Sequence, residues 1–330
     1  VFLFIDPIMG LLCVPAEIYS MMREYLWMIF WGILAVFLYN FFASLLRSVG
    51  NSFVPLLFLG IAAVLNVVLD LVFVLVFNWG VAGAAGATVI AQYVSGIGIA
   101  IYTYVKMPEF RVAGSDMGMD RGVLREISQF SVLTCAQQSV MNFGILMVQG
   151  LVNSFGTVIM AAFAAAGKID SFAYMPVQDF GNAFSTYVAQ NYGAGQTDRI
   201  KKGIRSAGLC SAVFCVCISV LVCAFASPLM SIFIDPGEGA IIAAGVHYLR
   251  IEGACYIGIG ILFLLYGYYR AVNQPQMSVV LTIASLGTCV VLAYLLSATP
   301  LGVTGIWLSV PIGWALADAI GIGYYLKKKR

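Results

Sequence analysis

Long apolar runs alternate with short polar connections along almost the whole chain. A helix that crosses the hydrocarbon core of a bilayer needs about 20 mainly apolar residues, and nine runs reach that length. They cover residues 25–46, 53–77, 81–105, 129–153, 159–185, 204–226, 241–268, 277–297 and 302–326. We expect residues 1–14 to be the end of a further helix. The pattern predicts an all-α polytopic membrane protein.

The composition supports a bilayer as the solvent. Of the 330 residues, 62% are hydrophobic and 10% are charged, whereas soluble domains carry about 25% charged residues. The formal charge of +2 implies no polyanionic partner. Because no basic patch is interleaved with aromatic residues, we expect no nucleic acid partner.

Catalytic and metal-binding chemistry are not expected. The eight cysteines form no C-x-x-C pair and there is a single histidine, so we expect no metal site and no cofactor. Cysteines within apolar runs are better explained as small side chains packed between helices. A membrane-embedded enzyme would need a His cluster, a Ser–His arrangement or a carboxylate pair at helical spacing. None is found, so the chain is not expected to be an enzyme.

The connections alternate in charge, which predicts the orientation. Fourteen of the 17 basic residues lie in one set of connections and at the C-terminus: Arg47, Lys106, Arg111, Arg121, Arg125, Arg199, Lys201, Lys202, Arg205, Arg270 and residues 327–330. The other connections contain no Lys or Arg. By the positive-inside rule, the basic set and the C-terminus are cytoplasmic.

An internal repeat relates the two ends of the chain. Residues 1–108 align with residues 222–328, with prolines, glycines and the pair Arg47 and Arg270 in register. Repeats of whole transmembrane bundles are typical of transporters. We therefore expect two six-helix bundles, of which the first is incomplete here by about 110 residues, because residues 111–221 have no counterpart in the first repeat.

This repeat gives the expected domain organisation. Residues 1–110 are the partial first bundle, with the end of helix 3 and helices 4–6. Residues 111–128 are a cytoplasmic linker, and residues 129–330 are the second bundle, with helices 7–12.

Asp70 is the most informative polar residue. An ionised acid costs roughly 2.5–3.5 kcal/mol at the middle of a span, and Asp70 shares one helix face with Asn66, four residues before it. Thr88 follows in the next span. A carboxylate, an amide oxygen and a hydroxyl suit a hard cation such as Na⁺, although the carboxylate could carry H⁺ instead. A helix–helix hydrogen bond from Asp70 to Asn66 or Thr88 is the structural alternative.

The second bundle has further polar residues within its spans. The candidates for substrate binding or gating are Gln149, Lys168, Asp170, Gln178, Asp179, Asn182 and Glu252. We expect Pro176 to interrupt its helix and free backbone carbonyls. Lys168 and Asp170 are two residues apart and should point in different directions. Asp318, near the end of the last span, is expected to reach the headgroups.

Several motifs in order resemble the multidrug and toxic compound extrusion (MATE) family, over essentially the whole chain. They are LLRSVGNS at 45–52, NVVLD at 66–70, GVAGAAGATVIAQ at 80–92, GLVNSFGTVIMAAFAAAGKID at 150–170 and STYVAQNYGAGQTDR at 185–199. The resemblance implies an antiporter in the cell (inner or plasma) membrane, working as a monomer. It would export small organic, mostly cationic drugs in exchange for Na⁺ or H⁺.

The resemblance also assigns the cation site of the first bundle. Asn66, Asp70 and Thr88 match three of its ligands, and the fourth, an Asp on the first helix, lies outside this chain. The acids that some branches carry on the seventh helix are absent, so no cation site of that kind is implied in the second bundle. The alternative is a flippase for lipid-linked oligosaccharides or lipids, which would need a cavity lined by several cationic side chains.

Overall fold

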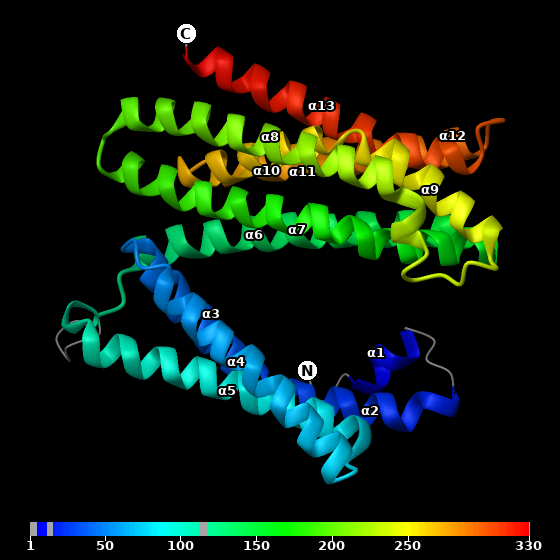
Figure 1. The fold of residues 1–330 in the computed structure, drawn as a ribbon. Coiled ribbons are helices and arrows are strands. Elements are labelled where there is room, and N and C mark those ends of the chain that lie inside the picture. Colours follow the sequence, from blue (N-terminus) through cyan, green and yellow to red (C-terminus); the bar gives the residue numbers. More distant parts are fainter. Residues whose placement is uncertain (1–4, 12–15, 112–117, 330) are drawn as a thin grey trace. The chain divides into compact units, whose positions relative to one another are not determined.

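The computed structural model describes residues 5–11, 16–111 and 118–329, and all regular elements in these ranges are helices (Figure 1). The chain divides into two compact units, Val1–Gly118 and Met119–Arg330. Of the segment 111–128, which we expected to be a linker, residues 112–117 lie outside the described residues, and the long first helix of the second unit begins at Arg121.

The first unit is built around one long helix, α5, which packs against both α3 and α4. Its helices are α1 (Ile5–Leu11), α2 (Ala16–Trp31), α3 (Ile33–Ser48), α4 (Phe53–Leu71), which continues as a π-helical turn η2 (Val72–Val76), α5 (Gly80–Lys106) and the 3₁₀ turn η3 (Pro108–Phe110). A Cβ on Gly96 of α5 would lie 2.6 Å from the Ala35 carbonyl oxygen of α3. Small residues therefore bring these helices together, as they do in membrane bundles.

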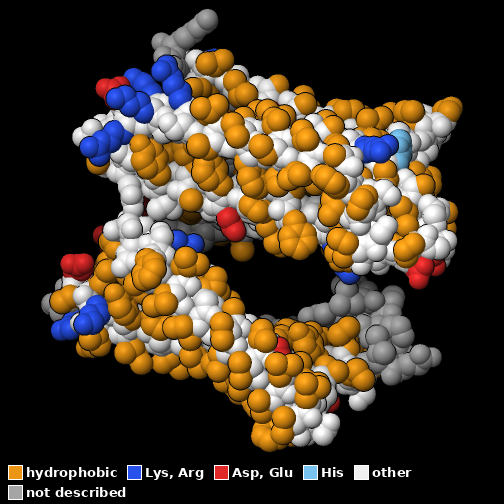
Figure 2. Space-filling model, viewed as in Figure 1, with side chains coloured by type: hydrophobic (Ala, Val, Ile, Leu, Met, Phe, Trp, Pro, Cys, Tyr) orange, Lys and Arg blue, Asp and Glu red, His pale blue; other side chains and the backbone are white. Residues whose placement is uncertain are grey.

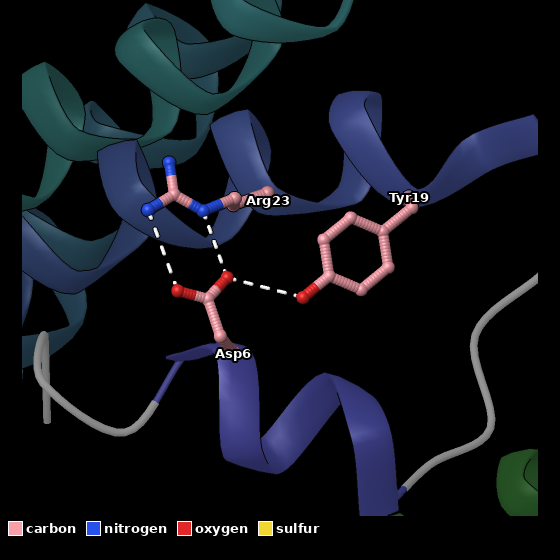
Figure 3. Close-up of polar contacts among 3 residues, drawn as sticks. All are labelled: Asp6, Tyr19 and Arg23. Carbon is pink, nitrogen blue, oxygen red and sulfur yellow. Dashed lines mark hydrogen bonds and ion pairs between the residues drawn. The ribbon is translucent and has the colours of Figure 1, made fainter. Parts of the chain in front are cut away.

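An ion pair joins α1 to α2. Figure 3 shows the carboxylate of Asp6, on α1, facing Arg23 and Tyr19 on α2. Arg23 Nε donates to Asp6 Oδ1 at 2.9 Å, and the Tyr19 hydroxyl donates to the same oxygen at 3.1 Å. Arg23 is one of the three basic residues outside the basic set of connections. The ion pair partly neutralises its charge.

The second unit contains the longer helices. They are α6 (Arg121–Asn153), α7 (Thr157–Gly193), α8 (Thr197–Met230), α9 (Gly239–Gly253), α10 (Tyr256–Ala271), α11 (Pro275–Thr282), the π-helical turn η5 (Ile283–Gly287), α12 (Thr288–Ser297) and α13 (Val303–Lys329). Helix α10 packs along α7, α8 and α13, and α7 and α8 run side by side in opposite directions (Figure 1). Large side chains such as Trp307 and Tyr269 fill the core, each 1% exposed.

The predicted membrane spans are confirmed with one correction. Eight helices of the described residues are long and apolar enough to cross a membrane, and a bent pair, Gly239–Gly253 and Tyr256–Ala271, supplies a ninth. We expected 241–268 to be a single span, but it is broken by 51°. At the break, the Cys255 N–H donates to the Glu252 carbonyl at 2.9 Å, so a tighter i→i+3 turn replaces the α-helical pattern without proline.

The first unit has a helix interruption at the position that the repeat predicts, although residues 19–48 still form one span there. Helices α2 and α3 meet at Gly32, and α9 and α10 meet at Ala254–Cys255, so the two breaks are aligned. The lengths also match: α3 and α10 have 16 residues each, and α5 and α13 have 27 each. The repeated succession of helices agrees with the internal repeat seen in the sequence.

The expected interruption at Pro176 is wrong. Pro176 lies inside α7, which continues from Thr157 to Gly193. Proline has no N–H, so the Phe172 carbonyl loses its α-helical donor as expected, but the helix continues on both sides of Pro176. The polar side chains of this span are therefore held on one continuous helix.

The outer surfaces of both units suit a bilayer. Many large apolar side chains are more than half exposed, among them Phe53 at 71%, Val64 at 67% and Leu209 at 68%. Figure 2 shows that hydrophobic side chains dominate the visible surface of each unit. A soluble protein would not expose so many, because lipid is the solvent that does not penalise them.

Two glycines allow α7 and α10 to cross closely. A Cβ on Gly267 of α10 would lie 2.5 Å from the Gly181 carbonyl oxygen, and one on Gly181 would lie 2.9 Å from the Phe263 carbonyl oxygen. These neighbours are backbone atoms, which cannot move aside as a flexible side chain can. The two glycines therefore fix how closely α7 and α10 approach each other.

We predict that Gly267→Ala destabilises the second unit by about 1–3 kcal/mol through overpacking. The thermal unfolding midpoint in detergent should fall. The matched control is Gly208→Ala on α8, where a Cβ would meet no described atom within 4 Å and helix propensity should raise stability by up to about 1 kcal/mol. Equal midpoints for the two variants would contradict the close crossing.

Candidate functional site

The cation ligands predicted in the first unit lie on facing helices. Asn66 and Asp70 are on α4 and Thr88 is on α5, and all three are partly buried. The Asn66 amide nitrogen donates to the Thr88 hydroxyl at 3.3 Å, and that hydroxyl donates to the Ala84 carbonyl at 3.0 Å. The structure therefore brings Asn66 and Thr88 together.

Asp70 is not part of that hydrogen-bond network. Its Oδ1 atom is buried and has no hydrogen-bond partner among the residues that the structure describes. The structural alternative, a helix–helix hydrogen bond, is thus present between Asn66 and Thr88 but does not include the carboxylate. An unpaired carboxylate in an apolar setting is costly, and a bound cation or proton would remove that cost.

A second carboxyl site lies within the second unit, where the resemblance implied none. Asp170 on α7 accepts hydrogen bonds from two tyrosine hydroxyls, that of Tyr248 at 3.0 Å and that of Tyr256. The Glu252 carboxyl lies beside Asp170 and Tyr248. Glu252 is 6% exposed, and its Oε2 atom has no partner within the described part of the chain.

The break between α9 and α10 assembles this group. Tyr248, Glu252 and Tyr256 are spaced four residues apart, with the first two on α9 and the third at the start of α10. The two tyrosines therefore approach Asp170 from opposite sides of the break, Tyr248 from α9 and Tyr256 from α10. Two adjacent carboxylates, one buried and one partly buried, repel each other, so a shared proton or a cation between them would stabilise the pair.

A cavity of about 330 Å³ opens onto the carboxyl pair. Its lining contains seven aromatic side chains: Phe163, Tyr174, Tyr248, Phe263, Tyr266, Trp307 and Trp314. Phe163 stacks on Trp307 with ring centroids 5.5 Å apart. The only charged side chains in the lining that the structure describes are those of Asp170 and Glu252. An aromatic cavity with acids suits a positively charged, partly apolar ligand.

The remaining candidates of α7 do not line this cavity. Lys168 is exposed, and its ammonium lies 5.5 Å from the Phe233 ring centroid, so Lys168 and Asp170 point apart as predicted. Gln178 donates to the Tyr174 hydroxyl at 3.5 Å, and Asn182 accepts from Arg270 Nη2 at 3.0 Å. Asp179 is exposed.

Two further polar residues lie away from the carboxyl pair. Gln149, the candidate on α6, donates to Asn153 on the same helix at 2.8 Å. Asp318 is 7% exposed and faces Gly258 of α10, so the expectation that it reaches the headgroups is wrong. The bundle buries it because its face of α13 packs on α10.

Sequence reasoning missed the two tyrosines that bind Asp170. The spacing of Tyr248, Glu252 and Tyr256 places all three on one helical face, which is the signal that could have found them. Over residues 5–11, 16–111 and 118–329, no group of three His, Cys, Asp or Glu side chains could hold a metal ion. The site's chemistry is therefore that of carboxyl, hydroxyl and aromatic groups.

The chain is similar to known proteins over nearly its whole length. The family model MatE matches residues 1–72 and 131–295. The probable multidrug resistance protein YpnP of Bacillus subtilis is 28% identical over 325 residues, which cover 98% of this chain and 72% of that protein. The FAD transporter of Shewanella oneidensis is 24% identical, over 99% of this chain and 72% of its own length.

The fold has close counterparts among solved structures. The MATE transporter VcmN of Vibrio cholerae matches with a TM-score of 0.90 and 22% identity, over 99% of this chain and 74% of that chain. Since the family model matches residues in both units and well over half of the chain, the protein belongs to the MatE family of membrane transporters.

Proposed function

We propose that this protein is a secondary antiporter that exports organic, mostly cationic drugs in exchange for Na⁺ or H⁺. Family membership makes it a multi-pass membrane transporter rather than an enzyme. Relatives named for multidrug resistance, including YpnP, support drug efflux. The cationic character of the substrate and the coupling to an ion are our inferences from the two carboxyl sites.

The aromatic cavity of the second unit carries the proposal. Its volume of about 330 Å³ is within the range of small-molecule sites. Asp170 and Glu252 offer negative charge to the ligand, and Trp307 offers an aromatic face. A hydrophobic cation gains from both features, because cation–π contacts are stronger in a desolvated site.

The first unit would hold the coupling ion. Asn66, Asp70 and Thr88 supply an amide oxygen, a carboxylate and a hydroxyl, which are the ligand types of a hard cation. The unpartnered oxygen of Asp70 supports a role in ion binding rather than in packing. One inward charge at 100 mV is worth about 2.3 kcal/mol, which corresponds to a gradient of roughly fifty-fold.

A lipid or oligosaccharide flippase is the alternative, and the cavity disfavours it. Lipid-linked sugars carry phosphates, and a site for them needs cationic side chains. The lining that the structure describes has two acids and no Lys, Arg or His. The same electrostatics disfavour an anionic dinucleotide, although one relative is named an FAD transporter.

The membrane setting follows from the spans and the basic connections. We propose a monomer in the cell membrane, inner or plasma, with its C-terminus in the cytoplasm. Its partners would be small organic cations and the lipid bilayer. No cofactor is required, because the ion gradient supplies the free energy.

Neutralising either cavity acid should weaken binding of an organic cation. For Asp170→Asn and Glu252→Gln we predict at least a tenfold higher Kd for ethidium, because truncating a buried charge contact costs about 2–5 kcal/mol. Fluorescence titration of the purified protein in detergent measures this. The matched control is Asp179→Asn, which removes the same charge from the same helix at an exposed position. If that control loses as much affinity, the cavity is not the binding site.

Neutralising Asp70 should uncouple transport without removing substrate binding. We predict that Asp70→Asn lowers gradient-driven ethidium export from proteoliposomes at least tenfold. Its ethidium Kd should stay within a factor of two of the value that the unsubstituted protein has without Na⁺ and at high pH, since the substrate site lies in the other unit. Glu109→Gln, which neutralises an exposed acid of the same unit, should transport normally. Normal export by Asp70→Asn would show that Asp70 is structural.

A further inference from the structure

A second pocket lies at one end of the second unit, away from the carboxyl pair. It has a volume of about 280 Å³ and is formed where α7 and α13 end, where α8 begins and where α10 passes into α11. This is the end that carries the basic connections. By the positive-inside rule, it faces the cytoplasm. The pocket shares no lining residue with the aromatic cavity, and the proposed transport function does not use it.

Tyrosines make up much of the pocket lining: Tyr192, Tyr268, Tyr269, Tyr324 and Tyr325. The ring of Tyr268 contacts those of Tyr269 and Tyr325, each with centroids 5.3 Å apart. The Tyr269 hydroxyl is occupied, since it donates to the Gly321 carbonyl at 2.7 Å. Tyrosine is enriched at the membrane–water interface because its ring is apolar and its hydroxyl is polar.

Two lysines give the pocket its charge. Lys201 and Lys328 both line it, and no acidic residue is among the lining residues that the structure describes. Lys201 contacts Asp198 at 3.2 Å, but these side chains are 55% and 87% exposed, so the pair is weak. Figure 2 shows a group of Lys and Arg side chains at this end, over the α7–α8 connection and beside the end of α13.

We propose that this pocket binds the phosphate headgroup of an anionic phospholipid from the cytoplasmic leaflet. Lysines attract the phosphate, tyrosine hydroxyls can donate to its oxygens, and the apolar rings contact the glycerol and the first methylenes of the chains. Basic pockets between transmembrane helices on the cytoplasmic side are suited to such headgroups. The apolar tyrosine rings beside the two lysines favour a lipid over a soluble phosphate.

The test compares two double variants of equal charge. Lys201→Gln with Lys328→Gln removes the pocket lysines. Lys202→Gln with Lys327→Gln removes exposed neighbours on the same helices that do not line the pocket. The affinity of the purified chain for phosphatidylglycerol is measured by native mass spectrometry, with phosphatidylcholine as the neutral lipid. Each variant is first checked for an unchanged unfolding midpoint without lipid.

We expect the pocket variant to weaken phosphatidylglycerol binding by roughly 30-fold, because each lysine near an anionic headgroup contributes about a factor of five. The control variant should change it less than threefold, and phosphatidylcholine should bind weakly throughout. Equal losses in both variants would overturn the proposal, since they would indicate general attraction to a basic surface. No loss in either variant would also overturn it.

A separate arm distinguishes the lipid from a soluble phosphate. Glycerol 3-phosphate is titrated into the lipid-free chain, and we expect no binding at concentrations that saturate phosphatidylglycerol. If it binds as tightly as the lipid and the pocket variant abolishes that binding, the pocket recognises a soluble organic phosphate and the lipid proposal is wrong.

Discussion

The cost of placing a carboxyl group in hydrocarbon shapes both candidate sites of this protein. Each within-span acid must be compensated by a hydrogen bond, a proton or a cation, because the bilayer supplies no water. Asp170 is compensated by two tyrosine hydroxyls. Asp70 and Glu252 each have an oxygen without a partner among the described residues. Where the protein itself does not offset the cost of a carboxylate, the binding of a cation lowers the free energy most.

The packing of α7, α9 and α10 brings the carboxyls of Asp170 and Glu252 next to each other. The glycine crossing of α7 and α10 allows close approach of the helices that bear Asp170 and Tyr256. The bend between α9 and α10 places Tyr248 and Glu252 beside Asp170. Broken helices at the binding level are a recurring device of secondary transporters. Here the sharp bend occurs in the second repeat, and the first repeat has only an interruption at Gly32 within one span. Only the second repeat carries an acid at this place, since the position that matches Glu252 is Ile29.

Much of the fold could be predicted from the sequence because a membrane span leaves a simple signal. The nine apolar runs of the sequence correspond, among the described residues, to eight membrane-spanning helices and one bent helix pair. The bend itself was not predicted, since it has no proline, and Pro176, which suggested an interruption, does not break α7. The pairing of Asp170 with Glu252 joins residues 82 positions apart in the chain, and hydrophobic periodicity carries no information on such distant contacts.

The first-unit site was more accessible to sequence reasoning because its residues are close together. Asn66 and Asp70 share one helical face, and Thr88 lies on the following helix, so a hairpin of two spans is expected to bring them near one another. The contact of Asn66 with Thr88 agrees with that expectation. That Asp70 Oδ1 has no partner among the described residues could not be predicted, because it depends on which side chains the folded helices bring near it.

The central claim is that a coupling ion and an organic cation bind at separate carboxyl sites and oppose each other. The most direct measurement is the ethidium Kd of the purified protein across a range of Na⁺ concentrations and of pH. Opposed binding at separate sites predicts a Kd that rises with Na⁺ or with H⁺ and then levels off, as reciprocal coupling between two sites requires. A Kd that neither ion changes would contradict the account, and one that rises without limit would place both cations at a single site.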